Sequence, residues 1–276
     1  NVPLEQGRRR QGKGKGKGNG GGGDRAERWD SGKCARELEE LLRRRSAAGQ
    51  REIQRVRRGL PISSRRSEIL DLVRSNQVVL LAGETGCGKT TQVPQMLAES
   101  CWEEGRACKI VVTQPRRISA ISVAERIASE RGEKVGQSVG YSIRLEKKGT
   151  ASSSIVMCTN GVLLRQLVQG GSLAGAGGAG SGSITEGLTH LVVDEIHERD
   201  RFADFLLIIL REVLPRNPKV KVVLMSATLQ VDLFSSYFLG CPTIRVDGFM
   251  YPVEQFYLED VLGLLGRKAR AGSRAK

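Results

Sequence analysis

The stretch VVLLAGETGCGKTTQ, residues 78–92, decides the fold of this chain. Residues 78–82 are apolar and rich in aliphatic and β-branched side chains, which is typical of a buried parallel strand. The glycine-rich segment GETGCGKT follows at 83–90, and residues 89–99 are predicted to form a helix. A strand, a glycine-rich turn and a helix N-terminus in succession are the setting in which such a segment binds phosphate.

The glycine-rich segment supplies the candidate ligands of a nucleotide. Its glycines let the backbone N–H groups turn inward, and the helix dipole adds positive potential at the same place. The Lys89 side chain is expected to reach the β- and γ-phosphates, and the Thr90 hydroxyl to bind Mg²⁺. The alternative is an ordinary glycine-rich turn between a strand and a helix. The full set of candidates is Gly83, Glu84, Thr85, Gly86, Cys87, Gly88, Lys89, Thr90 and Thr91.

A second apolar run, residues 188–193, ends in the acidic pair Asp194 and Glu195. Because ligands of open α/β sheets gather at the carboxyl ends of strands, this pair is expected beside the phosphate site. Asp194 is expected to hold Mg²⁺ through a water molecule, and Glu195 is the candidate base that orients and deprotonates the attacking water. The alternative is a helix N-cap with a solvated neighbour. His197, two residues further on, is a candidate relay of nucleotide state to the SAT segment at 226–228.

The order of several motifs is more specific than any one of them. The segments LPISSRRSEIL, GETGCGKTTQVPQ, TQPRRISAISVAERIA, VGYSIRLE, TNGVLLR, DEIHERD, LMSATL and YPVEQFYLEDVL follow one another between about residues 60 and 262. This series resembles the DEAH-type RNA helicases of superfamily 2, and Cys87 and Ile196 resemble the branch that contains RNA helicase A. The resemblance implies a RecA-like P-loop NTPase lobe, the first motor lobe of an RNA-dependent ATPase and RNA helicase that uses ATP and Mg²⁺.

The resemblance also assigns roles to residues outside the phosphate loop. The residues that match contacts to the RNA backbone are Arg116, Arg117 and Thr159. Those that match the nucleotide side of the site are Arg126, which stacks on the base, and the coupling residues Ser226 and Thr228. Guanidinium groups bind phosphate bidentately and stack on planar rings, so the chemistry agrees for the arginines. Arg126 is alternatively a solvated arginine on a helix at 118–130. Asn160 departs from the family pattern, in which Thr or Asp is common.

The remaining apolar runs, residues 110–113, 155–159 and 220–225, alternate with helical segments. This alternation predicts an α/β fold with a mostly parallel sheet and helices on both faces. Residues 59–252 are expected to form the ATP-binding domain. Within it, the segment GGSLAGAGGAGSGS at 170–183 has almost no side chains able to pack, and is expected to be a disordered insertion at the surface.

The net charge of +14 is unevenly distributed. Residues 1–66 contain 19 Lys and Arg against 8 Asp and Glu, whereas residues 67–266 contain 20 against 22. Residues 1–32 are expected to be a disordered tail rich in Gly, Lys and Arg, which either binds RNA or is a solvated linker. Residues 33–58 predict one or two basic amphipathic helices, broken near 47–49, that pack on the lobe, contact RNA or meet other domains.

Three function classes are compatible with a phosphate loop: a nucleic-acid motor, a nucleotide switch, and an RNA-binding regulator without turnover. TQPRR and SAT favour the motor over the switch, and an intact Glu195 favours turnover. The expected partner is RNA, with DNA as an additional candidate. A second RecA-like lobe and the C-terminal helicase modules are expected but missing, and residues 253–276 are expected to begin the connection to them, so the chain is expected to be a fragment.

Six cysteines without a C-x-x-C pair predict reduced thiols of an intracellular protein, not disulfides or zinc ligands. The sequence does not distinguish the cytoplasm from the nucleus. No apolar run is as long as a membrane span, so no membrane association is expected.

Overall fold

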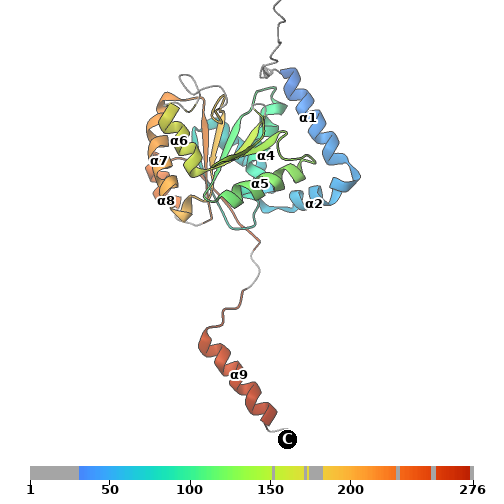
Figure 1. Ribbon diagram of the computed structural model, residues 1–276, viewed down its shortest axis with the longest axis vertical. Helices are drawn as coiled ribbons and strands as arrows, with labels where there is room; N and C mark the ends of the chain where they lie inside the picture. Colours follow the sequence, from blue (N-terminus) through green and yellow to red (C-terminus); the bar gives the residue numbers. More distant parts are fainter. Residues whose placement is uncertain are drawn as a thin grey trace, which may run out of the picture.

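The structure of the chain is a computed structural model that describes residues 31–150, 153–170, 173, 183–227, 231–249 and 253–273. An eight-stranded sheet forms its middle layer, and helices cover both faces of that sheet (Figure 1). The tail at 1–30 and most of the glycine-rich segment at 170–183 lie outside the described residues.

The strand order in the sheet is β4-β3-β5-β2-β6-β7-β1-β8. Neighbouring strands are parallel except for the antiparallel pair β3 and β4. The expected α/β class with a mostly parallel sheet is therefore confirmed. The strands are β1 (Val78–Gly83), β2 (Ile110–Gln114), β3 (Val139–Ile143), β4 (Glu146–Lys148), β5 (Ile155–Thr159), β6 (His190–Val193), β7 (Lys221–Ser226) and β8 (Thr243–Val246).

The two faces of the sheet carry separate apolar cores. Alternate residues of β1 divide between them: Leu81 packs on the face covered by α1, α3, α4 and α5, and Leu80 on the face covered by α6, α7 and α8. The helix α9 lies apart from the sheet (Figure 1). The helices are α1 (Ser31–Ser46), α2 (Arg51–Gly59), α3 (Arg66–Ser75), α4 (Lys89–Glu103), α5 (Arg117–Glu130), α6 (Asn160–Gly170), α7 (Arg201–Val213), α8 (Val231–Tyr237) and α9 (Leu258–Ser273), with short 3₁₀ turns at η1 (Ala48–Gln50), η2 (Pro61–Arg65), η3 (Ile196–Glu198) and η4 (Leu214–Arg216).

The strand predicted at 188–193 is shorter in the structure, because β6 begins at His190. The Leu188 N–H donates to the Thr185 carbonyl at 3.1 Å, so a turn occupies the positions before the strand. The helix predicted at 89–99 continues to Glu103 as α4. The strands β3, β4 and β8 have no counterpart among the apolar runs identified in the sequence.

The expectation for the glycine-rich segment is wrong at one residue. Leu173 is fully buried in the apolar core between the sheet and α6, α7 and α8. At its C-terminal end, the Ser183 hydroxyl donates to the Gln166 side chain at 3.2 Å. A single leucine in a run of glycine and alanine therefore packs into the core, although the composition of the segment indicated a surface loop.

Helices α1 and α2 pack on the same face as the phosphate-loop helix α4. Cys34 and Leu41 of α1 are buried in the core there. In the same region Arg45 pairs with Glu99 at 2.6 Å, and Arg57 of α2 lies 3.4 Å from the carboxylate of Glu130. Part of the basic charge of this segment is therefore neutralised by acidic side chains of the lobe.

Candidate nucleotide and nucleic-acid site

The sheet order brings the ends of four motif-bearing strands together. β1 leads into the phosphate loop, β7 into the SAT segment, β6 into DEIH and β2 into TQPRR. These strands are neighbours in the order β2-β6-β7-β1. Since they are parallel, their carboxyl ends meet at one edge of the sheet, where ligands of such sheets bind.

Two glycines give the phosphate loop its conformation. Gly86 and Gly88 have φ values of 85° and 96°, in the left-handed region that a residue with a Cβ adopts at a cost. Gly88 immediately precedes α4, so the loop leads directly into the N-terminus of that helix. On the outer side, the Ile62 N–H donates to the Cys87 carbonyl at 3.2 Å, which ties η2 to the loop.

A pocket of about 290 Å³ opens beside this loop. It brings together Lys89, Thr90 and Glu195 with Arg126, as the sequence predicted. It also contains Leu60 and Glu130, which the sequence analysis did not single out. The complete lining is Leu60, Thr85, Gly86, Gly88, Lys89, Thr90, Thr91, Arg126, Glu130 and Glu195.

Apart from Asp194, four predicted nucleotide-site residues that the structure describes do not line this pocket. A Cβ added at Gly83 would lie 2.9 Å from the Cys87 sulfur, so the start of the loop is closely packed. The Glu84 carboxylate accepts a hydrogen bond from the Gly248 N–H at 3.0 Å and is thereby directed toward the segment after β8. Burial raises the pKa of the Cys87 thiol, which is therefore neutral at physiological pH. Ser226 is buried at the end of β7.

The Asp194 carboxylate is completely buried and fully hydrogen-bonded. It accepts from the Thr90 hydroxyl at 2.6 Å and from the Gln114 amide at 2.7 Å, and its second oxygen accepts from the Glu195 N–H at 2.9 Å. Burial raises the pKa of Asp194, and these hydrogen bonds oppose the rise. Gln114 was missed in the sequence analysis, although it directly precedes PRR at the end of β2.

Glu195 has a strained backbone. Its φ and ψ are 54° and 39°, a left-handed conformation that a non-glycine residue adopts at a cost of about 1–3 kcal/mol. Burial, together with the adjacent Asp194 carboxylate, raises the pKa of its side chain, which makes it a stronger base. Glu195 occupies the N-cap position of the short turn η3, but its side chain makes no capping hydrogen bond there. Asp200 instead caps α7, accepting from the Phe202 N–H at 2.8 Å.

His197 lies between the acidic pair and the SAT segment. Its Nδ1 atom is 3.3 Å from the Ala227 N–H and 3.3 Å from a carboxylate oxygen of Glu195. One nitrogen cannot accept from Ala227 and donate to Glu195 at the same time, so the tautomer of His197 decides which contact is a hydrogen bond. The structure thus gives His197 a contact to both segments. Thr228 lies outside the described residues.

Arg126 is half-exposed, with its position fixed by Glu130. Its Nε donates to the Glu130 carboxylate at 2.8 Å, while 55% of its side chain is exposed. Glu130 is buried and accepts from the amides of Gln92 and Gln95, each at 2.8 Å. Arg57 adds a positive charge beside the same carboxylate, with its Nε atom 3.4 Å from a Glu130 oxygen. Arg126 is therefore held at the pocket wall rather than freely solvated.

The predicted RNA contacts lie at or just after the carboxyl ends of two neighbouring strands, β5 and β2. Thr159 is the register partner of Gln114, at the carboxyl ends of β5 and β2. Arg116 follows Gln114 by two residues, is 73% exposed, and lies 3.4 Å from Glu198. Arg117, which begins α5, is also exposed. These side chains occupy the same edge of the sheet as the pocket.

The structure gives a physical reason for the asparagine at position 160, where the family pattern commonly has Thr or Asp. Its side-chain amide donates to the Asp200 carboxylate at 2.6 Å, and the residue is buried. An aspartate at this position would bring a second carboxylate against Asp200, which is unfavourable in a buried setting. The hydrogen bond links the start of α6 to the N-cap of α7.

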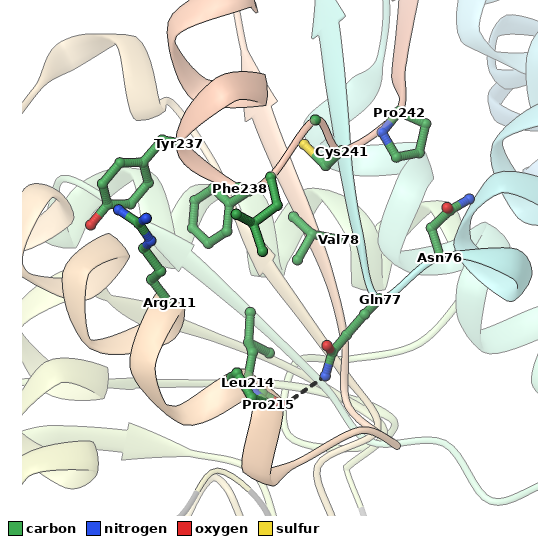
Figure 2. A pocket seen from close by; sticks show the side chains of 12 residues that line it. Asn76, Gln77, Val78, Arg211, Leu214, Pro215, Tyr237, Phe238, Cys241 and Pro242 are labelled. Atoms are coloured by element: carbon green, nitrogen blue, oxygen red, sulfur yellow. Dashed lines mark hydrogen bonds between the residues drawn. The ribbon is translucent and has the colours of Figure 1, made fainter.

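A further pocket of about 290 Å³ lies at the opposite edge of the sheet, beside the start of β1. Figure 2 shows Gln77, whose amide donates to the Leu214 carbonyl at 2.9 Å, on one side of this pocket. On the other side the Arg211 guanidinium lies 4.7 Å from the centre of the Tyr237 ring. None of the predicted site residues lines this pocket.

Comparison with known proteins agrees with this arrangement. The family model described as DEAD/DEAH box helicase matches residues 64–234, a range that contains the phosphate loop, the acidic pair and the SAT segment. The chain belongs to the DEAD/DEAH box helicase family. Membership implies that this helicase lobe uses a nucleotide.

Curated relatives share about half of the residues of this DEAD/DEAH box helicase lobe. The DExH-box ATP-dependent RNA helicase DExH6 of Arabidopsis thaliana is 56% identical over 78% of the chain, which corresponds to 16% of that relative. The ATP-dependent RNA helicase DHX30 of Gallus gallus is 49% identical over 75% of the chain and 16% of its own length. The chain therefore spans about one sixth of these relatives. Within the described residues, every helix is too short or too polar to cross a membrane.

Proposed function

We propose that the chain is the first motor lobe of an ATP-dependent RNA helicase, and that it couples ATP binding and hydrolysis to RNA binding. The observation that carries this proposal is the contact between the Thr90 hydroxyl and the Asp194 carboxylate at 2.6 Å. It joins the phosphate loop to the acidic motif of a strand that is not adjacent to β1. A hydroxyl and a carboxylate oxygen side by side are the hard oxygen ligands that Mg²⁺ would take, directly or through its bound water.

In the proposed mechanism, Lys89 and the backbone N–H groups of the loop hold the phosphates. Thr90 and Asp194 would hold Mg²⁺, which would neutralise negative charge on the phosphate oxygens. Glu195 orients and deprotonates the attacking water, and its raised pKa suits that role. His197, through Ala227, relays the state of the nucleotide site to the SAT segment.

Arg126 is proposed to stack on the base of the nucleotide. Glu130 supports this role, since it holds the Arg126 side chain at the pocket wall. Arg116, Arg117 and Thr159 are proposed to contact the RNA backbone, because exposed guanidinium and hydroxyl groups bind phosphate. The six free thiols favour an intracellular location.

Two substitutions separate nucleotide binding from hydrolysis. Lys89→Ala is expected to abolish ATP binding, because the cation that faces the phosphates is lost. Glu195→Gln is expected to keep binding and to lose hydrolysis by roughly 10²–10⁴-fold, in a protein that carries both lobes. Binding is measured by calorimetry and hydrolysis by phosphate release. Hydrolysis at the normal rate in the Glu195→Gln variant would show that another group is the base.

The 276-residue chain is expected to hydrolyse ATP at close to the background rate. The phosphate-binding groups on this lobe approach the nucleotide from one side, and an arginine from the opposite side is worth about 10³–10⁵ in rate. We propose that a second lobe supplies it, so adding that lobe should restore RNA-stimulated turnover. Strong RNA-stimulated hydrolysis by this chain alone would contradict the proposal.

A further inference from the structure

Three metal-binding side chains meet on the edge of the lobe opposite the nucleotide pocket. They are Cys101 near the end of α4, Cys108 in the connection to β2, and His190 at the start of β6. All three are buried, and one ligand atom from each lies within 4.8 Å of the others. Cys101 and Cys108 are separated by six residues, which is not a C-x-x-C spacing, and His190 lies much further along the chain, so the fold is needed to complete the cluster.

We propose that Cys101, Cys108 and His190 form a binding site for Zn²⁺. Two thiolates and one imidazole are the donors that tetrahedral zinc prefers. A zinc ion holds such ligand atoms roughly 3.5–3.8 Å apart, so small side-chain rotations are enough to close the present cluster around the ion.

The hydrogen bonds around the cluster prepare it for a metal. The His190 Nδ1 atom lies 2.9 Å from the Thr189 hydroxyl, and an Nδ1–H donating to that oxygen leaves the Nε2 lone pair for the ion. Burial lowers the pKa of His190 to about 4, so the ring is neutral at physiological pH. A hydrogen bond between the two thiols lowers the pKa of Cys101 and raises that of Cys108. Metal binding would displace both thiol protons.

A cavity of about 490 Å³ opens against the cluster and provides the fourth coordination position. Cys101, Thr189 and His190 line it together with Arg74, Arg106 and Lys221. A water molecule from this cavity would complete the tetrahedron. The cations favour the thiolates electrostatically, and zinc with two thiolates and a neutral imidazole carries no net charge, so the assembled site is compatible with basic neighbours.

The position of the site indicates a structural role. The ion would connect the end of the phosphate-loop helix α4 to the starts of β2 and β6. These strands end at TQPRR and at the acidic pair, on the far edge of the sheet. A zinc ion would therefore fix the relative positions of three elements that carry the nucleotide site, without touching the nucleotide.

The first test uses the reduced, metal-free 276-residue chain without nucleotide. Titration with Co²⁺ should give one equivalent of thiolate-to-cobalt absorption with the visible bands of a tetrahedral ion, and Zn²⁺ should displace it. A Zn²⁺ concentration of 100 times the Kd should raise the Tm by roughly 5–10 °C. Cys101→Ser and His190→Gln should lose both signals, whereas Cys241→Ser, a control at a buried thiol outside the cluster, should keep them.

A second measurement does not depend on the folding of any variant. X-ray absorption of the zinc-loaded wild-type chain should show two sulfur ligands at about 2.3 Å, with nitrogen or oxygen completing the shell at about 2.0 Å. Absence of the cobalt band, its persistence in Cys101→Ser, or a shell of nitrogen and oxygen alone would overturn the proposal. The last result would place the ion instead at hard oxygen ligands such as Thr90 and Asp194.

Discussion

Two glycines of the phosphate loop share a left-handed backbone but differ in their surroundings. A Cβ at Gly88 would meet the Leu60 side chain at 2.9 Å and the Ile62 side chain at 3.2 Å, whereas a Cβ at Gly86 would meet nothing within 4 Å. Glycine is therefore required at position 88 for two reasons: the backbone there is left-handed, and η2 approaches the loop too closely for a side chain to fit. Leu60 and Ile62 are in this way part of the nucleotide site.

Alanine substitutions at these two positions should have unequal effects on stability. Both impose left-handed strain of about 1–2 kcal/mol, and Gly88→Ala adds overpacking of about 1–3 kcal/mol. Thermal unfolding of the nucleotide-free chain should therefore show the larger loss of Tm for Gly88→Ala. Equal losses would mean that η2 moves away from the loop without cost.

Leu173 offers a second test at the scale of one side chain. Leu173→Ala removes a fully buried group and is expected to lower the free energy of unfolding by about 2–5 kcal/mol. Leu145→Ala is the matched control, because Leu145 is 95% exposed, and its effect should stay within about 0.5 kcal/mol. Urea denaturation measures both. A neutral Leu173→Ala would show that the glycine-rich segment contributes nothing to the core.

At the scale of elements, α2 is held by one arginine more than by apolar packing. The helix has no buried residue, yet only 12% of the Arg57 side chain is exposed, beside Glu130. Burial lowers the pKa of Arg57 to about 10, so the group remains charged at physiological pH. The chain of contacts from Arg57 through Glu130 reaches Arg126 at the pocket wall.

Removal of this arginine should cost far more than removal of an exposed one on the same helix. Arg57→Ala breaks a buried ion pair and is expected to cost about 3 kcal/mol. Arg55→Ala is the control, since Arg55 is 77% exposed and pairs with Glu52 one turn away, an interaction worth about 0.5 kcal/mol or less. Both values follow from chemical denaturation. Similar losses for the two variants would argue against a stabilising role of α2.

Sequence patterns predicted the elements better than the contacts between them. The strand at 155–159 has the predicted bounds, and the helix break near 47–49 is where α1 ends. An apolar run is a local signal in the sequence. It predicts a strand of this sheet well because the central strands of a parallel sheet are buried on both faces and are therefore apolar along their whole length. The strands β3, β4 and β8 were missed because no such run marks them in the sequence.

In the candidate site, too, residues within contiguous motifs could be predicted from the sequence, whereas residues that reach the site from elsewhere in the chain could not. The phosphate loop and the acidic pair are contiguous motifs, and the structure brings Lys89, Thr90 and Glu195 to one pocket. Gln114 and Glu130 are ordinary polar residues in the sequence. The position of Gln114 beside Asp194 depends on strand order, which no local pattern encodes. Glu130 lies one helical turn from Arg126, but its burial among the amides of Gln92 and Gln95 depends on helix packing.

At the scale of the whole molecule, the basic N-terminal region divides into two parts. Residues 1–30 contain 8 Lys and Arg against 4 Asp and Glu. The described helices that follow contribute more positive charge, but Arg44, Arg45 and Arg57 pair with acidic side chains of the lobe. A cut at residue 67 would therefore damage the lobe as well as remove charge.

A cut before Ser31 isolates the contribution of the tail to RNA affinity. Each phosphate contact that is lost should reduce the slope of log affinity against log salt by about 0.7 for single-stranded RNA, with a similar effect on all sequences. A control of full length, with glycine or serine in place of the tail lysines and arginines, should match the truncated chain. An unchanged slope would identify the tail as a solvated linker and assign binding to the lobe.

The position of β1 in the sheet has a consequence for the order of synthesis. β1 pairs with β7 and β8, and its register partners extend from Val222 to Val246. The strand that leads into the phosphate loop therefore emerges from the ribosome before both of its partners and stays unpaired until β7 and β8 have been made. Such distant pairing slows folding and leaves an apolar strand open to association with other chains. ATP capture by a nascent chain would thus begin only after Val246 has emerged, and would report that translation of the lobe is complete.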